Sequence, residues 1–208
     1  MSTPDHVVSP PRAGRRERKK QETRKRIFES GVALFATHGY RGTSVEAVAE
    51  KVGISDAGVL YHFNSKADLL LAVLSHHDAR WAEMVTASKE LGPAGELHRL
   101  AEWGVEMERD IDLTALFVTL SAEHLRDDSA TNAYFRGRYQ IVLANYEDMF
   151  VAAAEAGLVR RDVDAPVEAR ALVGMLDGLR LQMFFTDGFS ISEAVRRHVH
   201  TVLERLAP

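Results

Sequence analysis

The sequence predicts an all-α protein in which a small N-terminal unit of three helices precedes a larger helical region. Three observations support this. After residue 20, apolar residues recur at helical spacing, and the alternating apolar and polar runs typical of strands are missing. Capping side chains begin several of these segments, and Gly or Pro residues separate many of them. The 208 residues are 46% hydrophobic and 27% charged, which is an ordinary globular composition.

The composition also excludes several classes of protein. The chain has no cysteine, which removes disulfides, thiol nucleophiles and thiolate metal sites. The longest uncharged apolar run, Leu69–Leu74, is far shorter than the roughly 18 residues that a membrane span needs. The first 14 residues lack the apolar segment of a secretory signal. We therefore expect a cytoplasmic protein without membrane contact.

Three helix starts close together predict the compact N-terminal unit. The first helix is expected at residues 22–38 and ends at Gly39, because glycine accommodates the backbone turn that ends many helices. The next three helices each begin at a hydroxyl side chain that can accept a hydrogen bond from an otherwise unpaired amide. These predicted caps are Thr43 (with Glu46 completing a capping box), Ser55 and Ser65.

Longer helices are expected after residue 66. We predict them at 66–88, 95–109, 112–126, 130–156, 166–186 and 191–206. Small residues at Ala171, Gly174 and Gly178 lie on one side of the 166–186 helix, where a partner helix can approach closely. This helix and the 130–156 helix from two copies would form a four-helix interface with two-fold symmetry. Alternatively, both helices build the core of a single chain.

Charge is distributed unevenly along the chain. Residues 1–66 contain 12 Lys and Arg against 7 Asp and Glu, a net +5, whereas residues 67–208 contain 14 against 23, a net −9. Nine basic residues and only two acidic ones lie between Arg12 and Arg26. A basic arm on an otherwise acidic protein indicates a polyanionic partner for that end, although a solvated tail would have the same composition.

Residues 44–63 have the spacing of a helix-turn-helix. Ala49 is a small residue where two short helices touch, Gly53 permits the turn, and aliphatic residues flank both. The second of these helices is short and polar on its outer side, so it can enter the major groove of DNA and meet base edges. The alternative is a helical hairpin with no role in DNA binding.

The segment from Thr23 to Leu70 resembles the N-terminal domain of TetR-type (TetR/AcrR-like) transcriptional repressors. The chain differs from many members at Leu60, where a tyrosine is usual, and at Asp56, where a basic or amide side chain is usual. The resemblance implies a homodimeric helical repressor that leaves its double-stranded DNA operator when a small molecule binds its C-terminal helices. The matching residues are Phe35, Gly39, Tyr40, Thr43, Val48, Ala49, Gly53, Ser55, Tyr61, His62, Phe63, Ser65 and Lys66.

The motif and the resemblance together define three regions. We expect a flexible basic arm at residues 1–20, a DNA-binding domain at 21–66, and an effector-binding and dimerisation domain at 67–208. The residues predicted to contact phosphates or bases are Arg15, Arg16, Lys19, Lys20, Thr43, Ser44, Ser55, Asp56, Ala57, Gly58, Tyr61, His62 and Lys66.

Polar side chains within apolar helices suggest an effector site. Asp177, Arg180 and Gln182 interrupt the apolar 166–186 helix, and a charge there needs a partner. Asp177 and Arg180 could pair with each other or orient a ligand, and the whole set could also be packed core. The effector, of unknown identity, is expected to be apolar with one polar or anionic end. The predicted effector residues are Trp103, Met107, Phe117, His124, Arg180 and Gln182.

No pattern in the sequence points to catalysis, to a metal or to a cofactor. A nucleophile elbow, a phosphate-binding glycine loop and a convincing carboxylate pair are all missing. Among the nine histidines, His76 and His77 are adjacent and His198 and His200 are two positions apart, so the side chains of each pair diverge on a helix. We expect no enzyme activity and neither a metal nor a cofactor. The competing functions are a helical protein-interaction module and an activator without a small-molecule effector.

Overall fold

The computed structural model of the chain describes residues 12–126 and 128–208, and these residues form helices joined by turns, without a strand. The predicted all-α class is confirmed. The elements are α1 (Arg12–Gly42), α2 (Val45–Val52), α3 (Asp56–His62), α4 (Lys66–Lys89), α5 (Gly92–Arg99), a 3₁₀ turn (Leu100–Glu102), α6 (Trp103–Arg109), α7 (Ile111–Glu123), α8 (Ala130–Glu155), α9 (Ala165–Gln182) and α10 (Ile191–Arg205).

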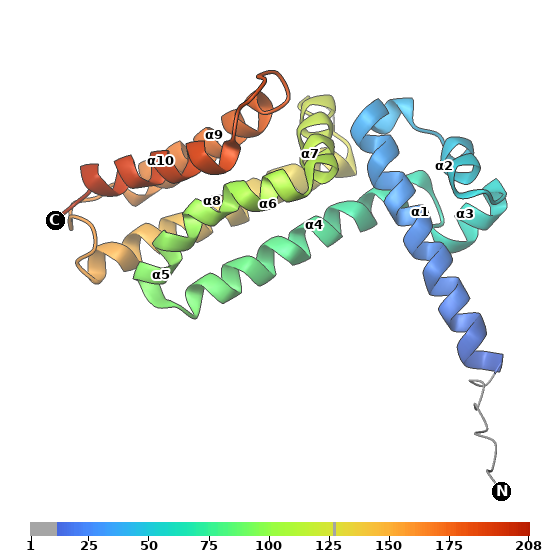
Figure 1. Cartoon of the computed structure of the whole chain (residues 1–208), viewed down its shortest axis with the longest axis horizontal. Helices are drawn as coiled ribbons and strands as arrows, with labels where there is room; N and C mark the ends of the chain where they lie inside the picture. The colour runs from blue at the N-terminus through green and yellow to red at the C-terminus, as the bar shows by residue number, and fades with distance from the viewer. Residues whose placement is uncertain (1–11, 127) are drawn as a thin grey trace, which may run out of the picture.

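The molecule is elongated, with α1–α3 at one end and α5, α8, α9 and α10 at the other (Figure 1). Helix α4 runs from the N-terminal unit into the larger region, and α7 lies beside α1 between the two ends (Figure 1). No helix among the described residues is both long enough and apolar enough to cross a membrane.

Helix α1 is longer than the sequence suggested. It begins at Arg12, so residues 12–20 of the predicted flexible arm are helical, whereas residues 1–11 lie outside the described part. The reason is local, because residues 15–26 are almost all Arg, Lys, Glu and Gln, which have high helix propensity. The N-terminal half of α1 therefore projects as a helix beyond α2 and α3 (Figure 1).

Two of the three predicted caps are confirmed, and one is wrong. Ser55 accepts from the Gly58 amide at 3.2 Å, and Ser65 accepts from the Asp68 amide at 3.0 Å. Helix α2 is capped by Ser44, which accepts from the Ala47 amide at 3.1 Å, and not by Thr43. The reason is that the Thr43 hydroxyl is buried and donates instead to two carbonyls of α1, those of Leu34 and Gly39, at 3.1 and 2.8 Å.

Two apolar cores hold the described residues together. One lies between α5, α6, α8, α9 and α10. The other joins α1, α2 and α3 to the first half of α4 and to α7, with Phe35, Leu70, Leu116 and Leu120 at most 1% exposed. The N-terminal unit therefore shares one core with α4 and α7, so any displacement of these two helices acts directly on it.

The segment predicted as one helix at 95–109 is divided into α5, the 3₁₀ turn and α6. Gly104 in α6 lies against the start of α10, where a Cβ atom would come 2.4 Å from the Cα of Ser192. Helix α9 ends at Gln182, four residues before the predicted end. On its outer side, a Cβ at Gly174 or Gly178 would meet no other element within 4 Å among the described residues.

Candidate nucleic-acid interface and interior cavity

Helix α3 presents its polar face to solvent. Asp56 and Ala57 are exposed, and Tyr61, at the other end of the helix, is 71% exposed. Val59 is buried on the opposite side and fixes α3 against the core. The small side chains of Ala57 and Gly58 leave the backbone of α3 accessible, so it can approach base edges closely.

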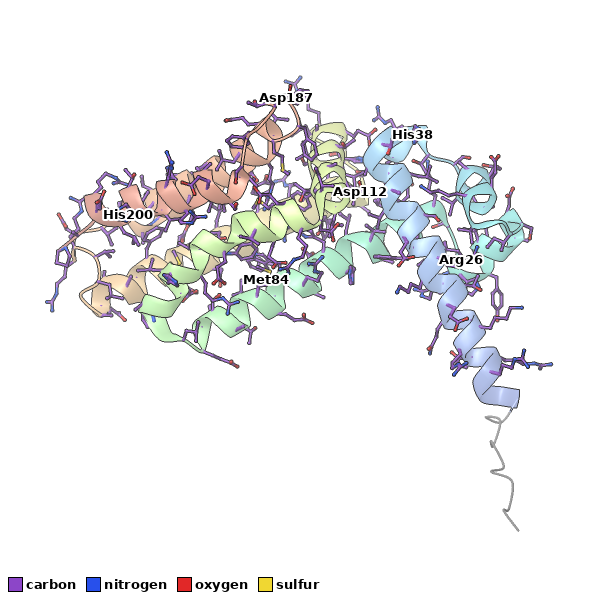
Figure 2. All side chains as sticks on the ribbon, in the orientation of Figure 1. Arg26, His38, Met84, Asp112, Asp187 and His200 are labelled. Carbon is purple, nitrogen blue, oxygen red and sulfur yellow. The ribbon has the colours of Figure 1, made fainter. Side chains whose placement is uncertain are left out.

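Basic side chains of α1 contact the end of α3. The Lys20 ammonium lies 5.5 Å from the centre of the Tyr61 ring. Arg24 donates to the His62 carbonyl, and its guanidinium lies 4.0 Å from the centre of the Phe63 ring. Arg26, on the side of α1 that faces α2, donates to the Val52 carbonyl (Figure 2). These contacts make the basic half of α1 continuous with the surface of α3.

His62 is held as a neutral ring at this junction. Burial lowers the pKa of His62, and the charges of Lys20 and Arg24 lower it further. Its ring meets that of Tyr61 edge to face, with 5.2 Å between the centres. Its Nδ1 atom is buried and has no hydrogen-bond partner in the described part of the chain. His62 is thus half-buried beside the tip of α3 and supports the position of Tyr61.

The structure does not bring all the predicted DNA-binding residues to one surface. Arg15, Arg16, Lys19, Lys20, Ser44 and Ser55 are exposed, whereas Thr43 is only 2% exposed. Lys66 donates to the Tyr40 and Thr43 carbonyls at 2.8 and 2.7 Å, so its ammonium already caps the end of α1. The DNA contacts assigned to Thr43 and Lys66 remain predictions, but both side chains have internal partners that the sequence did not indicate.

Four of the predicted effector residues line two adjoining interior cavities, of about 60 and 20 Å³, between α4, α6, α7, α8 and α9. Trp103, Phe117 and Arg180 line both, and Met107 lines the larger. Met84 forms part of the wall on the α4 side of the larger cavity, together with His77, Arg80 and Trp81 (Figure 2). A volume of this size holds only a few water molecules.

The other two predicted effector residues lie elsewhere. His124 follows the last turn of α7, where its ring is 5.9 Å from that of Tyr40, and it lines neither cavity. Gln182 is exposed at the end of α9. Spacing along the helices could not separate these two residues from the others, because the cavities are lined by α7 only as far as Phe117 and by α9 only as far as Arg180.

Charged pairs that the sequence analysis largely missed surround the cavities. Arg138 is 8% exposed, bonds Asp78 at 2.6 Å and lies 4.7 Å from the centre of the Phe117 ring. Asp177 accepts from Arg180 at 2.9 Å and from the Tyr139 hydroxyl at 2.7 Å. Asp177 and Arg180 are therefore an internal ion pair. A charged side chain on the inward face of an apolar helix was the available signal for Arg138.

Burial sets the protonation of the uncharged groups here. Burial lowers the pKa of His77, which stacks on Phe117 with 4.9 Å between the ring centres, so this histidine is neutral near pH 7. Burial and the bond to Asp177 raise the pKa of Tyr139 to about 12, so its hydroxyl stays protonated and donates. The cavity wall thus combines aromatic rings with ion pairs that are already formed.

A larger hollow is an open groove of about 760 Å³ between α1, α4 and the start of α7. Phe28, Val32 and Phe63 form part of its wall, and its rim carries both acidic and basic side chains, including Asp112 (Figure 2). Among the described residues, no group of three or more His, Asp and Glu side chains has a geometry that could hold a metal ion.

Two family models match the chain. Residues 27–73 match the bacterial regulatory proteins of the tetR family, and residues 93–208 match the C-terminal region of BetI-type transcriptional repressors. The second match covers more than half of the chain.

Individual proteins and structures agree with these matches. The chain is 27% identical to the transcriptional regulator TtgR of Pseudomonas putida, over 93% of this chain and 97% of that protein. It is 35% identical to TcmR of Streptomyces glaucescens, but over only 40% of that protein's length. A transcriptional regulator of Saccharomonospora viridis, solved in complex with choline, has the same fold with a TM-score of 0.74 at 24% identity, over 88% of this chain and 96% of that one.

Proposed function

Because this chain belongs to the TetR family of bacterial regulatory proteins, we propose that it binds a two-fold symmetric operator as a homodimer and leaves it when a small molecule binds its C-terminal helices. The chain is a DNA-binding transcriptional regulator, and the proposal concerns how it is assembled and released. A bacterial regulator that binds DNA acts in the compartment that holds the DNA, so we place this protein in the cytoplasm.

The observation that carries the DNA-binding part is the joint surface of α1 and α3. Lys20 and Arg24 extend the polar face of α3 with positive charge, and Tyr61, which is 71% exposed, lies beside Lys20. In this arrangement α3 enters the major groove and the basic half of α1 follows the phosphates. Asp56 either accepts a hydrogen bond from the amino group of a base or only stabilises the N-terminal end of α3 through its negative charge.

The exposed side of α9 supports a homodimer. Gly174 and Gly178 are open to close approach by another helix, and Val167 and Leu181 on the same side are 57% and 48% exposed. Because none of the described residues fills this side, Gly174→Arg is expected to leave the folded monomer intact while blocking association. Light scattering after size-exclusion chromatography measures the molar mass of each protein. We expect a dimer for wild type and a monomer for Gly174→Arg, and a monomeric wild type would exclude a homodimer.

The effector is proposed to bind in the cavities lined by Trp103, Met107, Phe117 and Arg180. Their small volume means that a ligand must push the walls apart, and a ligand that fits only the opened state shifts the protein toward it. The favoured ligand is apolar with one anionic end, which would have to share Arg180 with Asp177, its partner at 2.9 Å.

A cationic effector is the second candidate, because the rings of Trp81 and Trp103 lie with 6.4 Å between their centres on the wall of the larger cavity. It would have to compete with Arg80, which pairs with the two acidic residues of that wall, Glu106 and Asp110. The structurally similar regulator of Saccharomonospora viridis was solved with choline. Thermal shifts measured with benzoate and with choline distinguish the two classes. If neither benzoate nor choline changes the unfolding temperature, the cavity is packed core and not an effector site for either class.

Selection of bound duplexes from a random pool is the experiment that tests the class. A palindromic motif with salt-sensitive affinity is expected, and it identifies the operator at the same time. The absence of any selected sequence would instead favour a helical protein-interaction module. A reporter gene driven from the selected operator then separates repression from activation.

A further inference from the structure

The last residue of α7 reaches into the N-terminal unit. The Glu123 carboxylate accepts from the Tyr40 amide, with 2.7 Å between Oε2 and the nitrogen. Its other oxygen occupies the space beside Gly39, where a Cβ would lie only 2.2 Å from Oε1. A side chain from α7 is therefore seated in the backbone of α1, 83 residues earlier in the chain.

Gly39 makes this contact possible. Its backbone has φ 68° and ψ 179°, a conformation that is essentially confined to glycine. The helical hydrogen-bonding pattern is interrupted here, so the Tyr40 amide is available to an acceptor from outside α1. Any other residue at position 39 would combine a strained backbone with a clash against Glu123.

The same peptide segment is held from the other side by α4. Lys66, the first residue of α4, donates to the Tyr40 carbonyl at 2.8 Å and to the Thr43 carbonyl at 2.7 Å. Its ammonium also lies 4.2 Å from the centre of the Tyr40 ring. Tyr40 thus receives a carboxylate from α7 at its amide and an ammonium from α4 at its carbonyl.

Both of these helices also line the interior cavities. Phe117 of α7 and Trp81 of α4 face them, and Phe117 precedes Glu123 by six residues, roughly 9 Å along the helix. We propose that Glu123 is a positioning residue, which fixes the orientation of the DNA-binding unit relative to α7 and transmits displacements of α7 to it. This inference rests on the proposed function, since it assigns the point through which the effector region acts on DNA binding.

The physical consequence concerns a palindromic operator. Two half-sites are bound together only when both DNA-binding units have the required orientation. If Glu123 no longer holds the unit, binding must order it, and that cost reduces affinity for the full operator. Binding of one unit to a single half-site does not require a fixed orientation and is expected to be unaffected.

The test compares Glu123→Ala and Glu123→Gln with Glu83→Ala, an exposed glutamate of α4 that serves as the matched control. Loss of a hydrogen bond to a charged group corresponds to a change of about tenfold in an equilibrium. Glu123→Ala is expected to bind the full operator about tenfold more weakly and a half-site duplex as tightly as wild type does. Glu123→Gln keeps a carbonyl acceptor and should recover most of the affinity.

Equal losses on both duplexes would mean that Glu123 only supports the local fold and would overturn the proposal, as would unchanged binding to both. A second measurement needs no DNA. Because the chain has no cysteine, spin labels can be attached to cysteines introduced at Glu50 of α2 and Glu204 of α10, both exposed. Glu123→Ala should broaden the distance distribution between them, and an unchanged width would refute the positioning role. If wild type binds no duplex, the proposed function fails while this measurement still tests Glu123.

Discussion

Neutralising Lys20 should weaken the salt dependence of DNA binding, whereas neutralising Arg18 should not. Both residues are exposed basic side chains on α1, two positions apart. At 100° per residue they point about 160° away from each other, and Lys20 is the one beside Tyr61 of α3. Arg18→Gln is therefore a matched control that removes the same charge from the other side of the helix.

The size of the effect follows from the number of phosphates released. Each phosphate contact contributes about 0.9 to the slope of log affinity against log salt. A homodimer carries two copies of Lys20, so Lys20→Gln should reduce the magnitude of the slope by about 1.8. Arg16 lies one turn before Lys20 on the same side of α1, so the double variant should lose about twice as much.

Fluorescence anisotropy with the selected operator, titrated between about 50 and 300 mM KCl, measures these slopes over the range where counterion release dominates. If Lys20→Gln and Arg18→Gln reduce the slope equally, only net charge matters, and the proposal that the Lys20 side of α1 faces the DNA is refuted. No change with Lys20→Gln would mean that the basic half of α1 is a solvated helix. Deleting residues 1–20 should flatten the slope further without altering the selected sequence.

Three further predictions concern readout, the cavity and acid stability. Asp56→Ala should change the preferred base at one position per half-site in a repeated selection, and an unaltered motif would limit Asp56 to a helix-end role. Met107→Trp should fill the cavity of about 60 Å³ and abolish the thermal shift given by whichever of benzoate or choline stabilises wild type, with operator affinity retained; unfolding would identify Met107 as packed core. The bidentate bond from Arg205 lowers the pKa of Glu168, so its contribution to stability is present above the ordinary carboxyl pKa and disappears as pH falls through the lowered value. Chemical denaturation should therefore show Glu168→Gln less stable than wild type at pH 7 and converging with it towards pH 3; a constant difference would contradict this linkage.

The helices were predictable because their signals are local. Ser55 and Ser65 each begin a helix because the hydroxyl accepts from an amide only three residues later. The apolar spacing of the later segments is likewise visible without any knowledge of tertiary contacts. Thr43 was assigned wrongly because its hydroxyl is satisfied by carbonyls of α1, which become available only once the N-terminal unit has folded.

Contacts between residues far apart in the chain could not be predicted from the sequence. Arg138 and Asp78 are 60 residues apart, and Glu123 is 83 residues from Tyr40, so no spacing rule connects them. The aromatic residues of the cavity could be predicted from the sequence, because Trp103 and Phe117 stand out as aromatic residues on the faces of expected helices. The point along α7 at which the cavity ends could not be predicted. His124 was therefore included among the effector residues, although it lies at the end of α7 beside Tyr40.

The part of α1 before Gly39 is a continuous helix, which makes it a lever arm with its pivot at Gly39. Arg15 lies 24 residues from that glycine, roughly 36 Å at 1.5 Å per residue. A rotation of about 5° at the pivot moves the far end by about 3 Å, which is the length of one hydrogen bond. A displacement too small to disturb the packing around Gly39 would thus be magnified until the basic end loses its register with the phosphates.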